Sequence, residues 1–227
     1  SEKAKEEITA LHHSISWIDM GYNAGFARAN NAAIKMAKGR NLLLLNTDTI
    51  IRENAIGKAL QLFEAEQNYS ACGVQLLNTD NSFQISGAQT VKGGINTLLS
   101  LPYWGDWVRF LGKIFGTKPP SIEKVEYKTD VDWIVGAFIL TKKSVVERAG
   151  LLDEDFFMYS EEIEWCSRLK KQGKLCLFGQ RAGKFRFQNT ETFIRNPFIK
   201  AYLGAVLIGA MYRIPDLPDH PLSTTQP

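Results

Sequence analysis

The sequence is poor in the residues that build metal clusters and disulfide frameworks. Its 227 residues include three cysteines, Cys72, Cys166 and Cys176, which share no CxxC spacing, so neither a zinc ribbon nor a disulfide scaffold is predicted. Each cysteine stands in an apolar stretch and is expected to be a buried free thiol, which favours a reducing, cytoplasmic compartment. The three histidines form no group with other ligand types and are expected to be surface or structural residues.

Charge of one sign is also scarce, and so are long hydrophobic runs. The 27 basic and 24 acidic residues leave a net charge of +3 without a basic stripe, so no nucleic-acid partner is predicted. No apolar run reaches the roughly 18–20 residues that a transmembrane helix needs. The nearest is residues 197–211, which is shorter and contains Lys200. Hydrophobic residues make up 44% and charged residues 22%, as in one globular domain with a small appendage.

Alternating strand and helix patterns predict an α/β domain with a mostly parallel central sheet flanked by helices. The helices are expected over residues 2–11, 23–39 and 53–66, at the end of the segment 129–150, within 156–173 after its aromatic residues, and over 197–212. The strands are expected over 13–20, 42–45, 70–76, 82–86, 175–178, 184–187 and on both sides of Gly136-Ala137. In such sheets, ligands bind beyond the carboxyl ends of the strands.

The segment "NLLLLNTDTI", residues 41–50, places Asp48 at such a strand end. Four leucines predict a strand that is buried on both faces. The carboxylate that follows fits a hard divalent cation bound to phosphate. A turn, or a cap for the helix that starts near Glu53, is the alternative interpretation of Asp48.

A second candidate site is the start of the helix in "NAGFARANNAAIKMAKG". Asn23, Gly25 and Phe26 precede or open this helix. Gly25 permits close backbone approach, and a helix N-terminus offers N–H groups to phosphate. Asn30 and Asn31 are poor helix formers, so each needs a hydrogen bond within the fold or a ligand to explain it.

Three stretches carry a family resemblance in their order and spacing. They are "NAGFARANNAAIKMAKGRNLLLLNTDT", "VDWIVGAFILTKKSVVERAGLLDEDFFMYSEEIEWCSRLKKQG" and the interval between them. Together they resemble family 2 glycosyltransferases of the bacterial rhamnosyltransferase-like branch. The resemblance implies a GT-A fold over residues 1–190, followed by a C-terminal helix and tail over 191–227.

The resemblance also implies chemistry and site residues. It implies inverting transfer of a sugar from a nucleotide-diphosphate donor to a saccharide or lipid-linked acceptor, in cell-surface polysaccharide synthesis. It implies Mg²⁺ or Mn²⁺ held by Asp48. The donor-binding residues would be Asn23, Gly25, Phe26, Asn30, Asp48, Gly136 and Ala137.

The general base would come from the acidic pair in "FMYSEEIEWCSRL". Glu162 stands where the family usually has aspartate, and Glu161 is the second candidate. The alternative is a pair of acids favoured by the helix N-terminus, with Ser160 as the N-cap. Gly136-Ala137 has a plain tight bend as its alternative. Trp133 is expected either to stack on an acceptor sugar or to belong to the core.

Besides Glu162, the sequence departs from the family at three places. It begins after the family's first βαβ unit, so the N-terminal nucleotide-binding part is expected to be incomplete. Either the sequence is a fragment, or the protein is truncated in nature, or another chain completes it. Asn46 replaces the first acid of the family's metal motif. No histidine stands near Arg186 and Gln188, where the family often has a metal ligand.

The C-terminal apolar segment has two interpretations. It is either an interfacial helix at the inner face of the cell membrane or a helix that caps the domain or forms a homo-oligomer. Two functions also compete with an active transferase. One is an inactive relative that binds a nucleotide sugar or a partner protein, and the other is an interaction domain built on the aromatic stretch 98–116.

Overall fold

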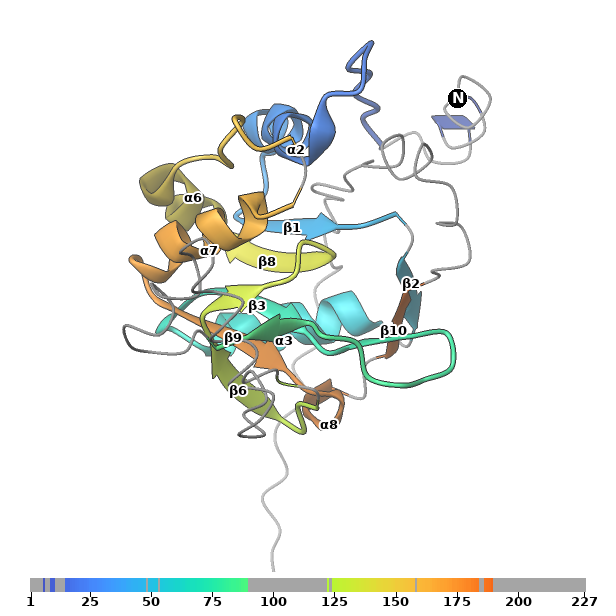
Figure 1. The fold of residues 1–227 in the computed structure, drawn as a ribbon, viewed down its shortest axis with the longest axis vertical. Helices are drawn as coiled ribbons and strands as arrows, with labels where there is room; N and C mark the ends of the chain where they lie inside the picture. Colours follow the sequence, from blue (N-terminus) through green and yellow to red (C-terminus); the bar gives the residue numbers. More distant parts are fainter. Residues whose placement is uncertain are drawn as a thin grey trace, which may run out of the picture.

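The computed structural model describes residues 6, 9–10, 15–47, 49–52, 54–89, 122, 124–157, 159–183 and 186–189. The helices are α2 (Gly25–Met36), α3 (Ala55–Ala65), α6 (Lys143–Ala149), α7 (Glu161–Lys170) and α8 (Gln180–Gly183). The strands are β1 (Asn41–Leu45), β2 (Thr49–Arg52), β3 (Tyr69–Val74), β4 (Leu76–Leu77), β5 (Gly87–Ala88), β6 (Lys128–Val131), β7 (Trp133–Ile134), β8 (Phe138–Lys142), β9 (Lys174–Phe178) and β10 (Arg186–Asn189). Figure 1 shows these elements stacked around one central sheet.

The central sheet has five strands in the order β1-β8-β3-β9-β6. β8 is antiparallel to both β1 and β3, β9 is parallel to β3, and β6 is antiparallel to β9. The α/β class is therefore confirmed, but the expectation of a mostly parallel sheet is wrong for these strands. The reason is that β8 lies between β1 and β3, so two strands of the same direction are neighbours of β8 rather than of each other.

Helices cover both faces of this sheet. Alternate residues of each strand point to opposite faces, and the buried side chains accordingly form two clusters. One cluster joins α2, α6 and α7 to one face through Leu42, Leu44 and Ile139. The other joins α3 to the opposite face through Leu45 and Phe138.

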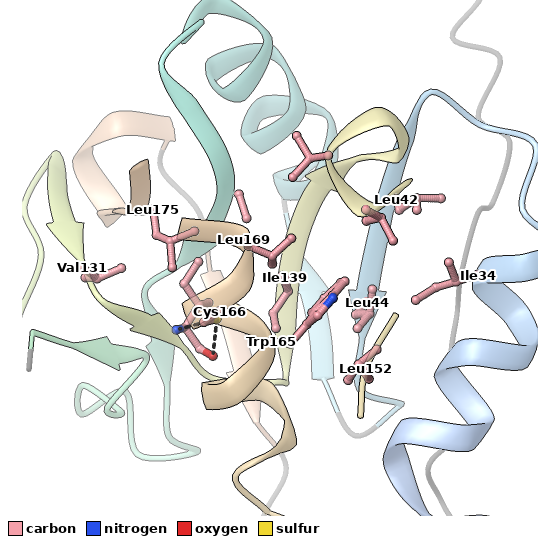
Figure 2. Close-up of a cluster of buried hydrophobic side chains, with 14 of the residues drawn as sticks. Ile34, Leu42, Leu44, Val131, Ile139, Leu152, Trp165, Cys166, Leu169 and Leu175 are labelled. Carbon is pink, nitrogen blue, oxygen red and sulfur yellow. Dashed lines mark hydrogen bonds between the residues drawn. The ribbon is translucent and has the colours of Figure 1, made fainter. Parts of the chain in front are cut away.

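Helix α7 packs on the first face through its central turns. In Figure 2, Trp165, Cys166 and Leu169 point from this helix toward the strands, and Trp165 lies near Ile139 and Leu44. The indole of Trp165 is fully buried, and its Nε1 donates to the carbonyl of Gly150 at 2.9 Å. A buried indole normally finds such a partner, so the orientation of α7 on the sheet is fixed by both packing and a hydrogen bond.

Two smaller sheets lie off the central one. β2, β10 and β4 form a three-stranded sheet, and β5 pairs with β7. β2 follows β1 and β4 follows β3, so the three-stranded sheet continues from the carboxyl ends of these two parallel-running strands. The three-stranded sheet therefore borders the edge of the central sheet at which the ligand is predicted to bind.

Three predicted elements differ from the structure. Residues 15–20 form no strand, because a strand needs a hydrogen-bonded neighbour and the described residues pair none with this segment. The predicted strand over 82–86 is reduced to one bridge between Phe83 and Leu77. The strand expected over 184–187 is β10 at Arg186–Asn189, whereas α7 begins at Glu161, after the aromatic residues, as predicted. The expected features over 98–116 and 191–227 lie outside the described residues.

The three cysteines are buried free thiols, as predicted. Burial raises the pKa of Cys166 and of Cys176 to about 12 and also raises the pKa of Cys72. At neutral pH these groups are thiols rather than the reactive thiolates. They therefore contribute to packing and not to nucleophilic chemistry.

Candidate functional site

The carboxyl end of β1 meets the turn between β7 and β8. The backbone N–H of Asn46 donates to the carbonyl of Ala137 at 3.0 Å. The N–H of Thr49 donates to the carbonyl of Asn46 at 3.2 Å, which holds the start of β2 close to the end of β1. Asp48 stands between these two residues in the sequence but lies outside the described residues. The side chains of Asn46 and Asp48 carry amide and carboxylate oxygens, and oxygen ligands of this kind suit a hard cation such as Mg²⁺ or Mn²⁺.

Gly136 and Ala137 are buried in the turn that leads into β8. The N–H of Phe138 donates to the carbonyl of Val135 at 3.4 Å, which closes the turn. A Cβ added at Gly136 would lie 3.1 Å from Cζ of Phe26. The structure thus brings Phe26, Gly136 and Ala137 together with Asn46, and a Cβ at 136 would be in tight contact with the ring of Phe26.

The start of α2 is built on a close backbone approach. Gly25 has φ +72°, and a Cβ there would lie 2.4 Å from the carbonyl oxygen of Phe157. That oxygen also accepts from the N–H of Phe26 at 3.4 Å. Asn23 is exposed, and its Oδ1 accepts from the N–H of Gly25 at 3.3 Å. Two of the N–H groups predicted to face phosphate therefore already have partners in the protein.

The two asparagines within α2 have different explanations. Both are buried, with 1% of each exposed. Asn31 hydrogen bonds with Leu152 and Glu154. The Nδ2 of Asn30 donates to the carbonyl of Phe26 at 2.8 Å, but its buried Oδ1 has no hydrogen-bond partner within the described part of the chain. The alternative of bonding within the fold therefore holds for Asn31, and Asn30 keeps an acceptor to offer to a ligand.

The acidic pair opens α7 after an unusual stretch of backbone. Tyr159 and Ser160 have φ of 70° and 73°, both in the left-handed region. Strain of this kind costs about 1–3 kcal/mol per residue and tends to occur at functional sites. Ser160 occupies the N-cap position as predicted, but it makes no side-chain capping bond, because its left-handed backbone departs from the extended conformation of capping residues.

The carboxylates of this pair are poorly satisfied. Only 4% of Glu161 is exposed, and Glu162 is half-buried. One buried oxygen of each, Oε2, has no hydrogen-bond partner among the residues that the structure describes. Burial raises the pKa of Glu161, and the neighbouring Glu162 carboxylate raises it further. Two adjacent acids with open oxygens are suited to exchanging protons with a ligand.

Other acids nearby are occupied by protein partners. The carboxylate of Glu164 accepts from Arg168 at 2.7 and 2.5 Å. The Oδ1 of Asp153 accepts from the N–H of Asp155 at 3.0 Å, and Glu154 accepts from Asn31 at 2.9 Å. Asp153 and Glu154 therefore shape the loop before α7.

Trp133 lies in β7 and packs partly against the helix-side core. Its neighbour Ile134 contacts Cys166 of α7, so Trp133 lies near the helix that begins with Glu161 and Glu162. The more exposed aromatic side chains are Phe157 and Tyr159, at 54% and 64% exposure, directly before the acidic pair. Both residues stand in the run "FFMYSEE", where several aromatic residues directly before two acids are the signal that marks them in the sequence.

No metal cluster or membrane helix occurs within the described residues. They contain no group of three or more histidine, cysteine or acidic residues placed to hold a metal ion. None of their helices is long and apolar enough to cross a bilayer. The predicted metal ligand Asp48 lies outside them, so its role stays a prediction.

Comparison with known proteins identifies the family. Residues 1–148 match glycosyl transferase family 2. The chain belongs to this family. A low-salt glycan biosynthesis hexosyltransferase, Agl10 of Haloferax volcanii, is 30% identical over 71% of this chain and 48% of its own length. The rhamnosyltransferase WbbL of Escherichia coli is 28% identical over 66% of this chain and 55% of its own length.

Two further similarities bear on the branch and the fold of this family 2 glycosyltransferase. An N-acetylglucosaminyl-diphospho-decaprenol L-rhamnosyltransferase of Mycobacterium tuberculosis is 24% identical over 73% of this chain and 56% of its own length. The crystal structure of GalNAc-T7 with UDP, GalNAc and Mn²⁺ superposes with a TM-score of 0.56 at 14% identity, over 84% of this chain and 35% of that one. The predicted rhamnosyltransferase-like branch and the GT-A fold are confirmed.

The matches cover only part of each relative and only part of this chain. The chain spans about half the length of the curated relatives that it matches. The family match ends at residue 148, before the acidic pair Glu161-Glu162. The family is therefore established by the sheet and by α2, whereas the catalytic assignment depends on the geometry at the start of α7.

Proposed function

We propose that this protein is an inverting glycosyltransferase that moves a sugar from a nucleotide-diphosphate donor to a saccharide or lipid-linked acceptor. The reaction would serve the assembly of a cell-surface polysaccharide. The observation that carries the proposal is the pair of buried oxygens, Oε2 of Glu161 and Oε2 of Glu162, without partners in the described part of the chain. Membership of the glycosyltransferase family gives these open carboxylates a chemical purpose.

The donor would occupy the edge where β1, α2 and the turn before β8 meet. Phe26 and Gly136 lie in contact distance there, and Asn46 bonds to Ala137. The Oδ1 of Asn30, which has no partner among the described residues, would accept a hydrogen bond from a hydroxyl group of the donor sugar. The exposed Asn23 precedes the first residue of α2. Asn46 and Asp48 would hold Mg²⁺ or Mn²⁺, which neutralises the charge that grows on the diphosphate leaving group.

In this mechanism Glu162 takes the proton from the acceptor hydroxyl as that oxygen attacks the anomeric carbon. The bond from the anomeric carbon to the diphosphate breaks on the opposite side, which inverts the configuration. Burial raises the pKa of Glu161, as does the neighbouring Glu162 carboxylate, and Glu161 is the second candidate for this base. Trp133, together with the exposed rings of Phe157 and Tyr159, would provide apolar faces for the acceptor sugar.

The proposal is tested by nucleotide release. The purified protein is incubated with UDP-, dTDP- and GDP-sugars and Mn²⁺, and release of the nucleoside diphosphate to water or to a lipid-linked saccharide is followed. We expect turnover with one nucleotide, a loss of at least a hundredfold in Glu162→Gln, and no loss in the control Glu164→Gln. Binding without turnover would support the inactive relative instead, and neither binding nor turnover would contradict both.

The organisation of the rest of the chain follows from the same proposal. We propose a transferase domain over residues 1–190 and a C-terminal appendage over 191–227. We also propose peripheral attachment at the inner face of the cell membrane, because one relative is named for a decaprenol-linked acceptor. Cell fractionation with and without residues 191–227 tests this: loss of membrane recovery on truncation supports it, and a change of oligomeric state supports the helix as a dimer interface.

A further inference from the structure

One segment connects the proposed binding edge for the sugar donor, at the start of α2, to α7, the helix that begins with the acidic pair. Residues 150–157, here called the strap, follow α6 and end shortly before α7. The strap runs antiparallel to the first half of α2. Phe157 meets Gly25 and Phe26 at the start of α2, Glu154 meets Arg28, and Leu152 meets Asn31 one turn further on.

Asn31 makes the strongest of these contacts. Its Nδ2 donates to the carbonyl of Leu152 at 2.8 Å, and its Oδ1 accepts from the N–H of Leu152 at 3.0 Å. The same Nδ2 donates to Oε1 of Glu154 at 2.9 Å. The amide thus satisfies the backbone of Leu152 as a neighbouring strand would. By contrast, the Arg28–Glu154 pair is 3.8 Å long and exposed, and exposed pairs contribute little.

The other edge of the strap is tied to α7. Nε1 of Trp165 donates to the carbonyl of Gly150 at 2.9 Å, and a guanidinium nitrogen of Arg168 donates to the carbonyl of Ala149 at 2.7 Å. Leu152 is 3% exposed and lies in the core between α2 and Trp165 (Figure 2). Glu161 stands one helical turn before Trp165, and both are buried, so movement of the strap would be transmitted to the acidic pair.

We propose that Asn31 is a positioning residue that clamps the strap and thereby fixes Glu161 and Glu162 relative to the donor edge of the sheet. The proposal deepens and rests on the proposed transferase function. Misplacement of a catalytic group by about 1 Å can cost on the order of a hundredfold in rate. A clamp with two hydrogen bonds to the buried backbone of Leu152 and a third to the Glu154 side chain is suited to prevent such misplacement.

The test exchanges donor and acceptor across the clamp. Asn31→Asp keeps the acceptor for Leu152 but places a carboxylate against the Leu152 carbonyl and Glu154. We expect kcat for nucleotide-sugar hydrolysis to fall at least tenfold, with KM within threefold. The double variant Asn31→Asp/Glu154→Gln restores a donor at 154 and is expected to recover at least threefold of that loss. Asn41→Asp, which disrupts an exposed Asn41–Glu64 bond of 2.8 Å at the far end of β1, is the matched control.

Hydrogen–deuterium exchange provides a readout that needs no activity. In Asn31→Asp, peptides over 150–164 should exchange at least tenfold faster, with peptides of β1 and β3 unchanged. Glu154→Ala, a change at an exposed residue, should raise exchange over 150–164 by a smaller factor and serves if Asn31→Asp does not fold. Exchange that rises equally in all peptides, or a kcat within twofold of the parent, would overturn the clamp. If the parent hydrolyses no nucleotide sugar, the proposed function fails and the exchange result still decides the clamp.

Discussion

The acidic pair at the start of α7 and the ionisable cluster on β3, β6 and β9 satisfy their charges in opposite ways. In the cluster, Asp130 accepts from the hydroxyl of Tyr69 at 2.6 Å and from Lys174 at 2.9 Å. In the pair, Glu161 and Glu162 each keep a buried oxygen without a partner among the described residues. Charges that stabilise a fold are matched inside it, and charges that act on a ligand stay open until the ligand arrives.

The largest effect should come from neutralising one acid in each region. Glu162→Gln removes the proposed base and should lower nucleotide-sugar turnover by about 10²–10⁴-fold, the range for general base catalysis. Asp130→Asn should leave turnover within twofold and lower the melting temperature instead. Turnover assays and thermal melts on both variants measure the two effects. A fall in turnover for both would remove the distinction between the regions.

The next largest effect should come from Gly25, on which the strap rests. Gly25→Ala places a Cβ 2.4 Å from the Phe157 carbonyl at φ +72° and should destabilise the protein by about 2–4 kcal/mol, from backbone strain and overpacking together. Gly21→Ala is the control, because Gly21 has φ +69° with nothing within 4 Å of its Cβ. Denaturant unfolding of both variants separates the clash from the strain. Equal losses would mean that the Phe157 contact is not close.

Glu161→Gln should stabilise the protein while it slows the reaction. The folded state raises the pKa of Glu161, so the acid contributes stability below its unfolded pKa and loses it as pH rises through the folded value. At neutral pH a neutral amide avoids that loss. A gain of about 1 kcal/mol would raise the melting temperature by about 2–4 °C in a protein of this size. Melts at pH 4 and pH 8 test the sign, since the gain should appear at pH 8 only.

The smallest effect should come from Tyr69→Phe, which deletes one bond of the satisfied cluster. The loss should be about 1 kcal/mol, as for a typical hydrogen bond. The hydrogen bond to Asp130 raises the pKa of Tyr69 to about 12, and the same bond lowers the pKa of Asp130. The stability from Asp130 is lost as pH falls below about 4, and that from Tyr69 is lost as pH rises from about 10 to 12. The free energy of unfolding, measured from about pH 3 to about pH 11, should therefore differ between parent and variant from about pH 4 to about pH 10, and the difference should shrink outside that range.

Local patterns predicted the elements of the fold well. The leucine run gave β1, and the alanine-rich segment gave α2. The order of strands could not be predicted, because the placement of β8 between β1 and β3 depends on packing between residues far apart in sequence. Residues 15–20 carried a strand pattern, yet a strand also needs a hydrogen-bonded neighbour, which no local pattern guarantees.

The site was partly predictable for the same reason. The acidic pair was visible because Glu161 and Glu162 are adjacent in sequence. The clamp was not visible, because Asn31 and Leu152 are separated by 121 positions and nothing in a sequence marks an amide that bonds to distant backbone. The burial that distinguishes Glu161 from Glu164 also depends on how α7 sits on the sheet, which only Trp165 and its neighbours determine.

The position of β8 has a consequence for how the protein is made. β1 and β3 leave the ribosome early, but each hydrogen bonds to β8 and not to the other. The apolar edges of both strands therefore stay unpaired until residues 138–142 have been synthesised. Non-local pairing of this kind slows folding, and the unpaired strand edges are prone to aggregation until the pairing has formed. Nascent chains that end before β8 should accordingly bind chaperones more than chains that extend past it, and the second edge of β3 is paired only when β9 has been synthesised.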